Sequence, residues 1–160
     1  MISVCFVCLG NICRSPMGEL ILKKMVKERG IALSFEITSR GTEAEEGCHV
    51  YRKAKAKLEE HGVEGDHIAR QLTRADVLNN DYILVMDSSN LFDVLRISGG
   101  NFGDRVYKLC AFTNRPRDIA DPWYTGDFDR AYEDICDGCE RFLDFITMEH
   151  AEALDYDKRH

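Results

Sequence analysis

Short apolar runs and helically spaced apolar residues alternate along the 160 residues of this chain. Apolar runs bounded by turn-forming residues predict four buried strands, at 2–7, 33–39, 82–86 and 105–109. Apolar residues three or four positions apart predict five helices, beginning near residues 15, 50, 74, 90 and 129. Strands that alternate with helices form βαβ units, so the pattern predicts an α/β fold with a mainly parallel sheet.

The first sixteen residues predict a strand, a short loop and a helix in immediate succession. Ser15 is a preferred helix N-cap and Pro16 suits the first helical position, so we expect the helix to begin there. The loop has a thiol at its start, Cys8, and a guanidinium at its end, Arg14. Loop amides that lead into a helix N-terminus point toward one place and favour an anion. Because ligands of parallel sheets bind beyond the carboxyl ends of the strands, this loop is the predicted site.

Charge and composition narrow the class of protein. The formal net charge of −7 argues against nucleic acid as a partner, because phosphate backbones are bound by basic faces. No segment has the roughly 18 apolar residues of a membrane span, and no secretory signal pattern begins the chain. We therefore expect a cytoplasmic protein without a membrane partner. We expect one domain over residues 1–150, followed by a polar tail over 151–160.

The chain has seven cysteines. Their odd number, and a core large enough to need no crosslinks, argue against a disulfide framework, so we expect reduced thiols. Cys136 and Cys139 form a C-x-x-C pair, but both fall on the apolar stripe of the last predicted helix. No second pair is present to complete a zinc site, so we expect both to pack in the core.

Cys8 and Arg14 bracket the loop in a pattern that suits phosphoryl transfer. A thiolate is the nucleophilic form of cysteine, and a helix N-terminus with a nearby guanidinium stabilises it. Arg14 would bind two phosphoryl oxygens, and attack by Cys8 would form a covalent thiophosphate. The leaving oxygen then needs a proton from a nearby carboxylic acid.

Two carboxylates are candidates for this acid. Asp87 directly follows a predicted strand, but it is also an obvious N-cap for the next helix. Asp121 lies in a predicted loop over residues 114–127 that is long and rich in aromatic residues, and long loops in compact domains are often functional. The residues alone favour Asp121 and leave Asp87 open.

The chain resembles the low-molecular-weight protein tyrosine phosphatases in two motifs, V-C-L-G-N-I-C-R-S-P near the start and D-P-W-Y near the end. The resemblance covers nearly the whole length and keeps the order of the motifs. It implies a flavodoxin-like three-layer sandwich with a four-stranded parallel sheet, and a reaction that needs no metal or cofactor. It makes Cys8 the nucleophile, Arg14 the phosphate clamp and Asp121 the general acid, which then becomes the base that activates water.

The resemblance also implies a supporting layer around the loop. Ser15 would stabilise the departing thiolate, and Asn11 would adopt a strained conformation held by Ser15, Ser39 and His67. Cys13 would form a protective disulfide with the nucleophile. The phosphate-binding loop itself is expected to comprise Leu9, Gly10, Asn11, Ile12, Cys13 and Ser15.

The pocket walls decide the expected substrate. Ile12 is apolar, which favours an aromatic ring, whereas related protein-arginine phosphatases have a threonine there. Trp123 and Tyr124 are expected to add a stacking face. The sequence therefore favours a protein tyrosine phosphatase, with two alternatives: a protein-arginine phosphatase, or a non-catalytic phosphate-binding module.

The chain departs from the family in the loop after the second strand, where an aromatic residue is common. Here the segment 43–46 has three acids, which would repel acidic peptides that flank a phosphotyrosine. Tyr51 is a candidate replacement for the missing ring. The expected partners are phosphotyrosine-containing proteins, with inorganic phosphate as the product, and the oligomeric state is not predicted.

Overall fold

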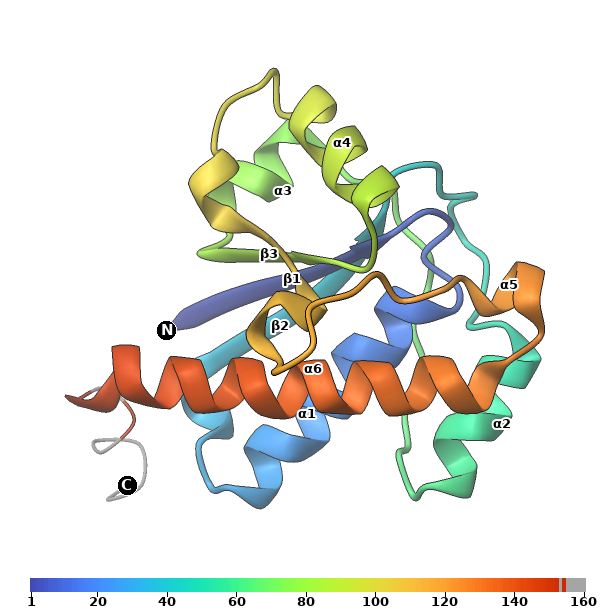
Figure 1. The fold of residues 1–160 in the computed structure, drawn as a ribbon, viewed down its shortest axis with the longest axis horizontal. Helices are drawn as coiled ribbons and strands as arrows, with labels where there is room; N and C mark the ends of the chain where they lie inside the picture. The colour runs from blue at the N-terminus through green and yellow to red at the C-terminus, as the bar shows by residue number, and fades with distance from the viewer. Residues whose placement is uncertain (153, 155–160) are drawn as a thin grey trace.

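The computed structural model describes residues 1–152 and 154, and its centre is a four-stranded parallel sheet (Figure 1). The strands are β1 (Ile2–Cys8), β2 (Phe35–Gly41), β3 (Tyr82–Val85) and β4 (Val106–Lys108). Their order across the sheet is β2-β1-β3-β4, and every neighbouring pair is parallel. The predicted sheet is confirmed. Of the tail expected over 151–160, residues 153 and 155–160 lie outside the described part of the chain.

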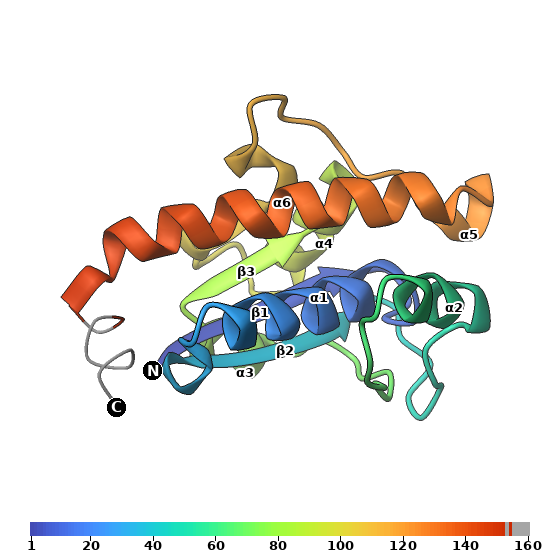
Figure 2. The same ribbon diagram turned by 90° about the horizontal axis from the view of Figure 1, so that it is seen from below.

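Helices cover both faces of the sheet and complete the expected three-layer sandwich (Figures 1 and 2). They are α1 (Arg14–Glu28), α2 (Arg52–Glu60), α3 (Arg74–Asn79), α4 (Ser88–Ile97), α5 (Pro122–Thr125) and α6 (Phe128–Glu149). Helices α1 and α6 cover one face, with α2 packed against both, and α3 and α4 cover the other. No helix in the described residues is long and apolar enough to cross a membrane.

The central strand β1 is apolar throughout because it is covered on both sides. Val4 and Phe6 face the layer of α1 and α6, whereas Cys5 and Val7 face α3 and α4, and all four are fully buried. Gly18 lets α1 lie close to this strand, since a Cβ there would be only 2.5 Å from the Phe6 ring. This close approach holds the first turns of α1 against the second half of β1.

The topology brings three loops together at the carboxyl edge of the sheet. Because β1 and β3 are neighbours while β2 and β4 flank them, the direction of winding reverses between β1 and β3. Ligands of such sheets bind at this reversal. The loop after β1, residue Asp87 after β3 and the segment that leads to α5 all reach this point.

Two local predictions need correction at this edge. Helix α1 begins at Arg14 with Cys13 in the cap position, so Ser15 is not the N-cap and Pro16 is the third helical residue. The segment 114–127 is mostly irregular, as expected, but it contains the single turn of α5. There Asp121 caps the helix and Pro122 is its first residue, the arrangement that had been expected for Ser15 and Pro16.

Candidate active site

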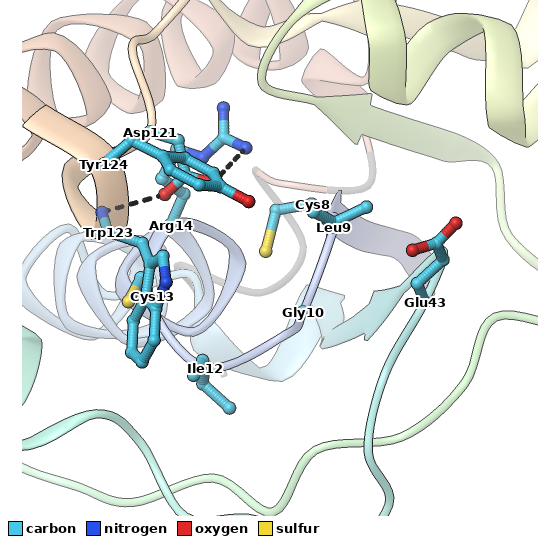
Figure 3. Close-up of a pocket in the computed structure, with 10 residues that line it drawn as sticks. All are labelled: Cys8, Leu9, Gly10, Ile12, Cys13, Arg14, Glu43, Asp121, Trp123 and Tyr124. Carbon is cyan, nitrogen blue, oxygen red and sulfur yellow. Dashed lines mark hydrogen bonds and ion pairs between the residues drawn. The ribbon is translucent and has the colours of Figure 1, made fainter.

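The loop between β1 and α1 lines a cavity of about 170 Å³ at the carboxyl edge of the sheet (Figure 3). Residues from three segments of the chain line it: Cys8, Leu9, Gly10, Ile12, Cys13, Arg14, Glu43, Asp121, Trp123 and Tyr124. The structure therefore brings the predicted nucleophile, clamp and acid into one pocket. Asn11 and Ser15, also predicted for this loop, are fully buried and do not line the cavity.

The Cys8 sulfur faces two hydrogen-bond donors at the base of the pocket. The Ser15 hydroxyl lies 2.9 Å from Cys8 Sγ, and the Asn11 amide donates to the same sulfur over 3.3 Å. Asn11 Nδ2 donates to Ser15 Oγ over 2.8 Å, which leaves the Ser15 proton for the sulfur or for the more distant Arg40 carbonyl oxygen at 3.4 Å. The Ser15 hydroxyl is therefore bonded within the site, next to the sulfur, and does not cap α1. Both donors favour the thiolate.

Asn11 adopts the left-handed conformation expected for it, with φ of 57°. Its side-chain amide donates to Ser15 Oγ and to Ser39 Oγ, the latter over 3.0 Å. Its Oδ1 accepts from His67 Nε2 over 2.7 Å and from the Arg70 amide over 2.9 Å. Four hydrogen bonds compensate the cost of the strained backbone, of the order of 1–3 kcal/mol. The structure thus brings Ser15, Ser39 and His67, the three residues predicted to hold Asn11, into hydrogen-bond contact with it.

A buried carboxylate, Glu19, extends this network beyond what was predicted. Its Oε1 accepts from Ser39 Oγ over 2.7 Å and lies 3.1 Å from His67 Nδ1, and its Oε2 lies 2.6 Å from Lys23 Nζ. Burial opposes the charge, but the hydrogen bonds from His67, Lys23 and Ser39 outweigh it and lower the pKa of Glu19 to about 2. Glu19 lies four residues after Ser15 in α1, and this spacing alone predicts that the two side chains share one face of the helix.

Arg14 is almost fully buried beneath the cavity, with its guanidinium held by oxygens on one edge. Its Nη1 donates to Asp87 Oδ2 over 2.7 Å and to the Ile119 carbonyl over 2.8 Å. Burial alone would lower the pKa of Arg14, but the negative charges of Cys8, Asp87 and Asp121 raise it. The guanidinium therefore stays charged and fixed, ready to bind an anion over the loop.

The two candidate acids differ in how much of their carboxylate is committed. Asp87 caps α4 through Oδ1, which accepts from the Asn90 amide over 2.8 Å, and its Oδ2 holds Arg14. It does not line the cavity. Asp121 accepts from the Trp123 amide over 3.0 Å, lies 3.4 Å from Arg14 Nη2 and does line the cavity (Figure 3). Asp121 is therefore the one of the two carboxylates that lines the cavity, whereas both oxygens of Asp87 are bonded, one to Arg14 and one to the first turn of α4.

An aromatic wall closes one side of the pocket. Trp123 and Tyr124 both line it, and their side chains are 54% and 76% exposed, which leaves their rings free to stack on a ligand. Tyr51 does not line the cavity. Its ring instead packs edge-on against Trp123 with 4.8 Å between ring centroids, and its amide donates to the Ile12 carbonyl over 2.8 Å. Tyr51 therefore supports both walls of the pocket from behind.

The remaining cysteine pair packs in the core, as expected. Cys139 is fully buried and Cys136 is half-buried against the same core, and burial raises the pKa of both thiols. No cluster of three or more metal-ligating side chains occurs among the described residues.

Comparison with known proteins assigns the family. Residues 3–157 match the family described as low molecular weight phosphotyrosine protein phosphatase. The low molecular weight protein-tyrosine-phosphatase PtpA of Staphylococcus epidermidis is 35% identical over 151 residues, covering 93% of this chain and 96% of the relative.

Solved structures agree with this match. YfkJ from Bacillus subtilis superposes with a TM-score of 0.89 at 33% identity, covering 94% of this chain and 97% of that one. The low molecular weight protein tyrosine phosphatase SP-PTP from Streptococcus pyogenes gives a TM-score of 0.82 at 33% identity, covering 94% and 99%. The chain therefore belongs to the low molecular weight phosphotyrosine protein phosphatases, hydrolases that cleave phosphotyrosine with a cysteine nucleophile.

Proposed function

We propose that this chain hydrolyses protein phosphotyrosine through a phosphocysteine at Cys8, with Arg14 as phosphate clamp and Asp121 as general acid and base. One observation supports this most strongly: all three side chains line a single cavity, and the Cys8 sulfur faces two hydrogen-bond donors. The scheme uses no metal and no cofactor.

In the first step the Cys8 thiolate attacks phosphorus. The sulfur–phosphorus bond forms as the bond from phosphorus to the tyrosine oxygen breaks, and the Asp121 carboxylic acid gives that oxygen its proton. The equatorial oxygens carry most of the charge throughout. Backbone amides of the loop from Leu9 to Cys13 and the buried Arg14 guanidinium bind these oxygens, and because the donors are already fixed, little reorganisation is needed.

In the second step water replaces the sulfur. The Asp121 carboxylate takes a proton from water, the oxygen attacks phosphorus and the sulfur–phosphorus bond breaks, which releases inorganic phosphate. The departing sulfur receives the Ser15 hydroxyl hydrogen bond over 2.9 Å, so the leaving thiolate is stabilised where it forms.

The apolar walls support phosphotyrosine as the substrate. Ile12, Trp123 and Tyr124 line the cavity around the loop. A phenyl ring gains stability by burying its apolar area against these side chains, whereas a guanidinium is destabilised there because it loses hydration. Hydrolysis of phosphoarginine is the alternative activity. A non-catalytic phosphate-binding module is the other alternative, and it conflicts with the membership of the chain in an enzyme family.

A substitution at Ile12 tests the substrate class. We expect the parent enzyme to hydrolyse a phosphotyrosine peptide with a higher kcat/KM than the matched phosphoarginine peptide. Ile12→Thr should lower that ratio by about 10-fold, because the ring loses roughly 1–3 kcal/mol of apolar contact in the pocket. Competing steady-state assays on the two peptides measure the ratio, and a parent enzyme that prefers phosphoarginine would overturn this proposal.

We further propose that Cys13 protects Cys8 against irreversible oxidation. Cys13 lines the same cavity, and burial raises its pKa to about 12, so it remains a thiol at neutral pH. Peroxide would convert the Cys8 thiolate to a sulfenic acid and release hydroxide. The Cys13 thiol would then attack that sulfur, expel water and form the disulfide, which a dithiol reductant reverses.

The redox proposal predicts a difference in recovery after oxidation. After brief peroxide treatment, dithiothreitol should restore most of the activity of the parent. It should restore much less in Cys13→Ser, because the sulfenic acid proceeds to sulfinic and sulfonic acids that thiols cannot reduce. Activity before and after reduction measures this, with the mass of the Cys8 peptide as a second readout, and equal recovery in the two proteins would contradict the role of Cys13.

We also propose a cytoplasmic location and phosphotyrosine-containing proteins as partners. All seven cysteines are unpaired, which is the state that a reducing compartment maintains. The acidic net charge of −7 supports protein rather than nucleic acid as the partner.

A further inference from the structure

Glu43 is an acidic residue in the wall of the active-site pocket. It lines the cavity, its side chain is exposed, and no basic side chain among the described residues pairs with its carboxylate. Its position is nonetheless fixed, because its amide donates to the Leu9 carbonyl over 2.8 Å and the preceding Thr42 amide donates to the Cys8 carbonyl over 2.9 Å. These two hydrogen bonds fix the position of the Glu43 backbone relative to the loop that begins at Cys8.

The other acids of the same segment are directed elsewhere. Glu46 accepts from the Gln71 amide over 3.2 Å, and Glu45 hydrogen-bonds the Cys48 thiol. Neither lines the cavity. Of the three acids in the segment 43–46, only Glu43 lines the pocket.

Gly41 explains how this segment comes so close to the phosphate loop. A Cβ at Gly41 would lie 2.8 Å from the Leu9 carbonyl oxygen and 3.0 Å from the Asn11 Cβ. The end of β2 can therefore rest against the loop, and the chain carries Glu43 to the Leu9 side of the pocket. In Figure 3 this side is opposite Trp123 and Tyr124.

The charges around the pocket set a requirement on the substrate. A phosphate dianion that enters beside Glu43 is repelled by its carboxylate. Arg14 is the only basic side chain among the described residues that line the cavity, and it is buried beneath the loop. A cation on the substrate next to the phosphorylated residue would pair with Glu43 and offset that repulsion. A carboxylate in the same place would add to it.

We propose that Glu43 is a specificity-determining residue that selects phosphotyrosine with a lysine or arginine beside it in the substrate sequence. The inference rests on the proposed phosphotyrosine phosphatase activity and adds the sequence context of the substrate. Because the pair forms at the solvent-exposed rim, the preference is moderate and weakens as salt screens it.

Three phosphotyrosine peptides test the selection, identical except for lysine, alanine or glutamate in the positions flanking the phosphotyrosine. We expect the kcat/KM of the parent enzyme to be roughly 10-fold higher for the lysine peptide than for the glutamate peptide. Glu43 attracts the lysine and repels the glutamate, and each of these interactions at the exposed rim is modest. Glu43→Gln should reduce this ratio to roughly 2-fold, the remainder arising from the net negative charge of the protein. Raising the ionic strength screens the Glu43 carboxylate, so it should lower the lysine-to-glutamate ratio of kcat/KM more in the parent than in Glu43→Gln.

Glu46→Gln is the matched control, since it removes the same charge from the same segment but outside the cavity. The lysine-to-glutamate ratio of kcat/KM in Glu46→Gln should stay close to that of the parent. The inference is overturned if Glu43→Gln keeps the full ratio, if Glu46→Gln lowers it equally, or if the parent shows no preference. These results all leave hydrolysis of the alanine peptide intact, whereas a parent that hydrolyses none of the three peptides overturns the proposed function itself.

Discussion

Replacement of Cys8 by serine is expected to lower turnover of aryl phosphates by at least about 10⁴-fold. A hydroxyl is almost wholly protonated at neutral pH. The two groups that contact the sulfur position, the Ser15 hydroxyl and the Asn11 amide, include no carboxylate or imidazole that could take its proton. The phosphate-binding amides and Arg14 are unchanged by this substitution. The variant should therefore still bind inorganic phosphate while it fails to form the covalent intermediate.

Rapid-quench trapping of phosphoenzyme, together with steady-state rates on aryl phosphates, measures this expectation. Cys48→Ser is a suitable control because it makes the same chemical change at a cysteine outside the cavity, and its rate should stay close to that of the parent. Equal rates for Cys8→Ser and the parent would end the thiolate mechanism, and with it the role assigned to Ser15.

The fold was predictable wherever burial imposes a simple pattern on the sequence. The apolar run of β1 is continuous because both of its faces are covered, and the run over 82–86 became β3 for the same reason. Helix α3 begins at Arg74, as predicted, since Thr73 and Asp76 form a capping box that the local sequence specifies. The second strand starts two residues later than predicted, because residues Ala32–Ser34 form a short 3₁₀ turn before it.

Local rules failed where a residue is used for tertiary contacts at the site. Ser15 and Pro16 have the signature of a helix start, yet the Ser15 hydroxyl is bonded within the phosphate loop and the helix begins two residues earlier than predicted, at Arg14. The capping rule considers only the helix, whereas the sulfur and the strained Asn11 compete for the same hydroxyl. A deviation of this kind marks a functional position.

The carboxylates show where sequence reasoning stops. The topology of a parallel sheet places Asp87 and Asp121 at one edge, but it does not say which way either side chain points. Asp87 lies 73 residues from Arg14 and bonds it directly, a contact that no local spacing encodes. The same limit applies to the segment 43–46, where the three acids look alike in the sequence and only Glu43 lines the pocket.

Asp121→Asn should slow hydrolysis of aryl phosphates by roughly 10²–10⁴-fold, the usual contribution of general acid catalysis. The loss should depend on the leaving group, being largest for phenyl phosphate and smaller for nitrophenyl phosphate, whose phenolate leaves without much help from a proton. Asparagine keeps the shape of the side chain and still caps α5, so the Trp123 amide keeps its acceptor and the aromatic wall keeps its place. Rates across a series of substituted phenyl phosphates measure this dependence.

Asp87→Asn is the matched comparison, because asparagine also preserves the cap of α4 while it removes the charge that holds Arg14. It should weaken the clamp and lower kcat/KM by a similar factor for every leaving group, since Arg14 binds the transferred phosphoryl group and not the phenol. The two carboxylates are thus distinguished by the shape of the leaving-group dependence as well as by the size of the loss. If Asp87→Asn gave the steep dependence and Asp121→Asn the flat one, the two roles would have to be exchanged, although Asp121 is the one that faces the cavity.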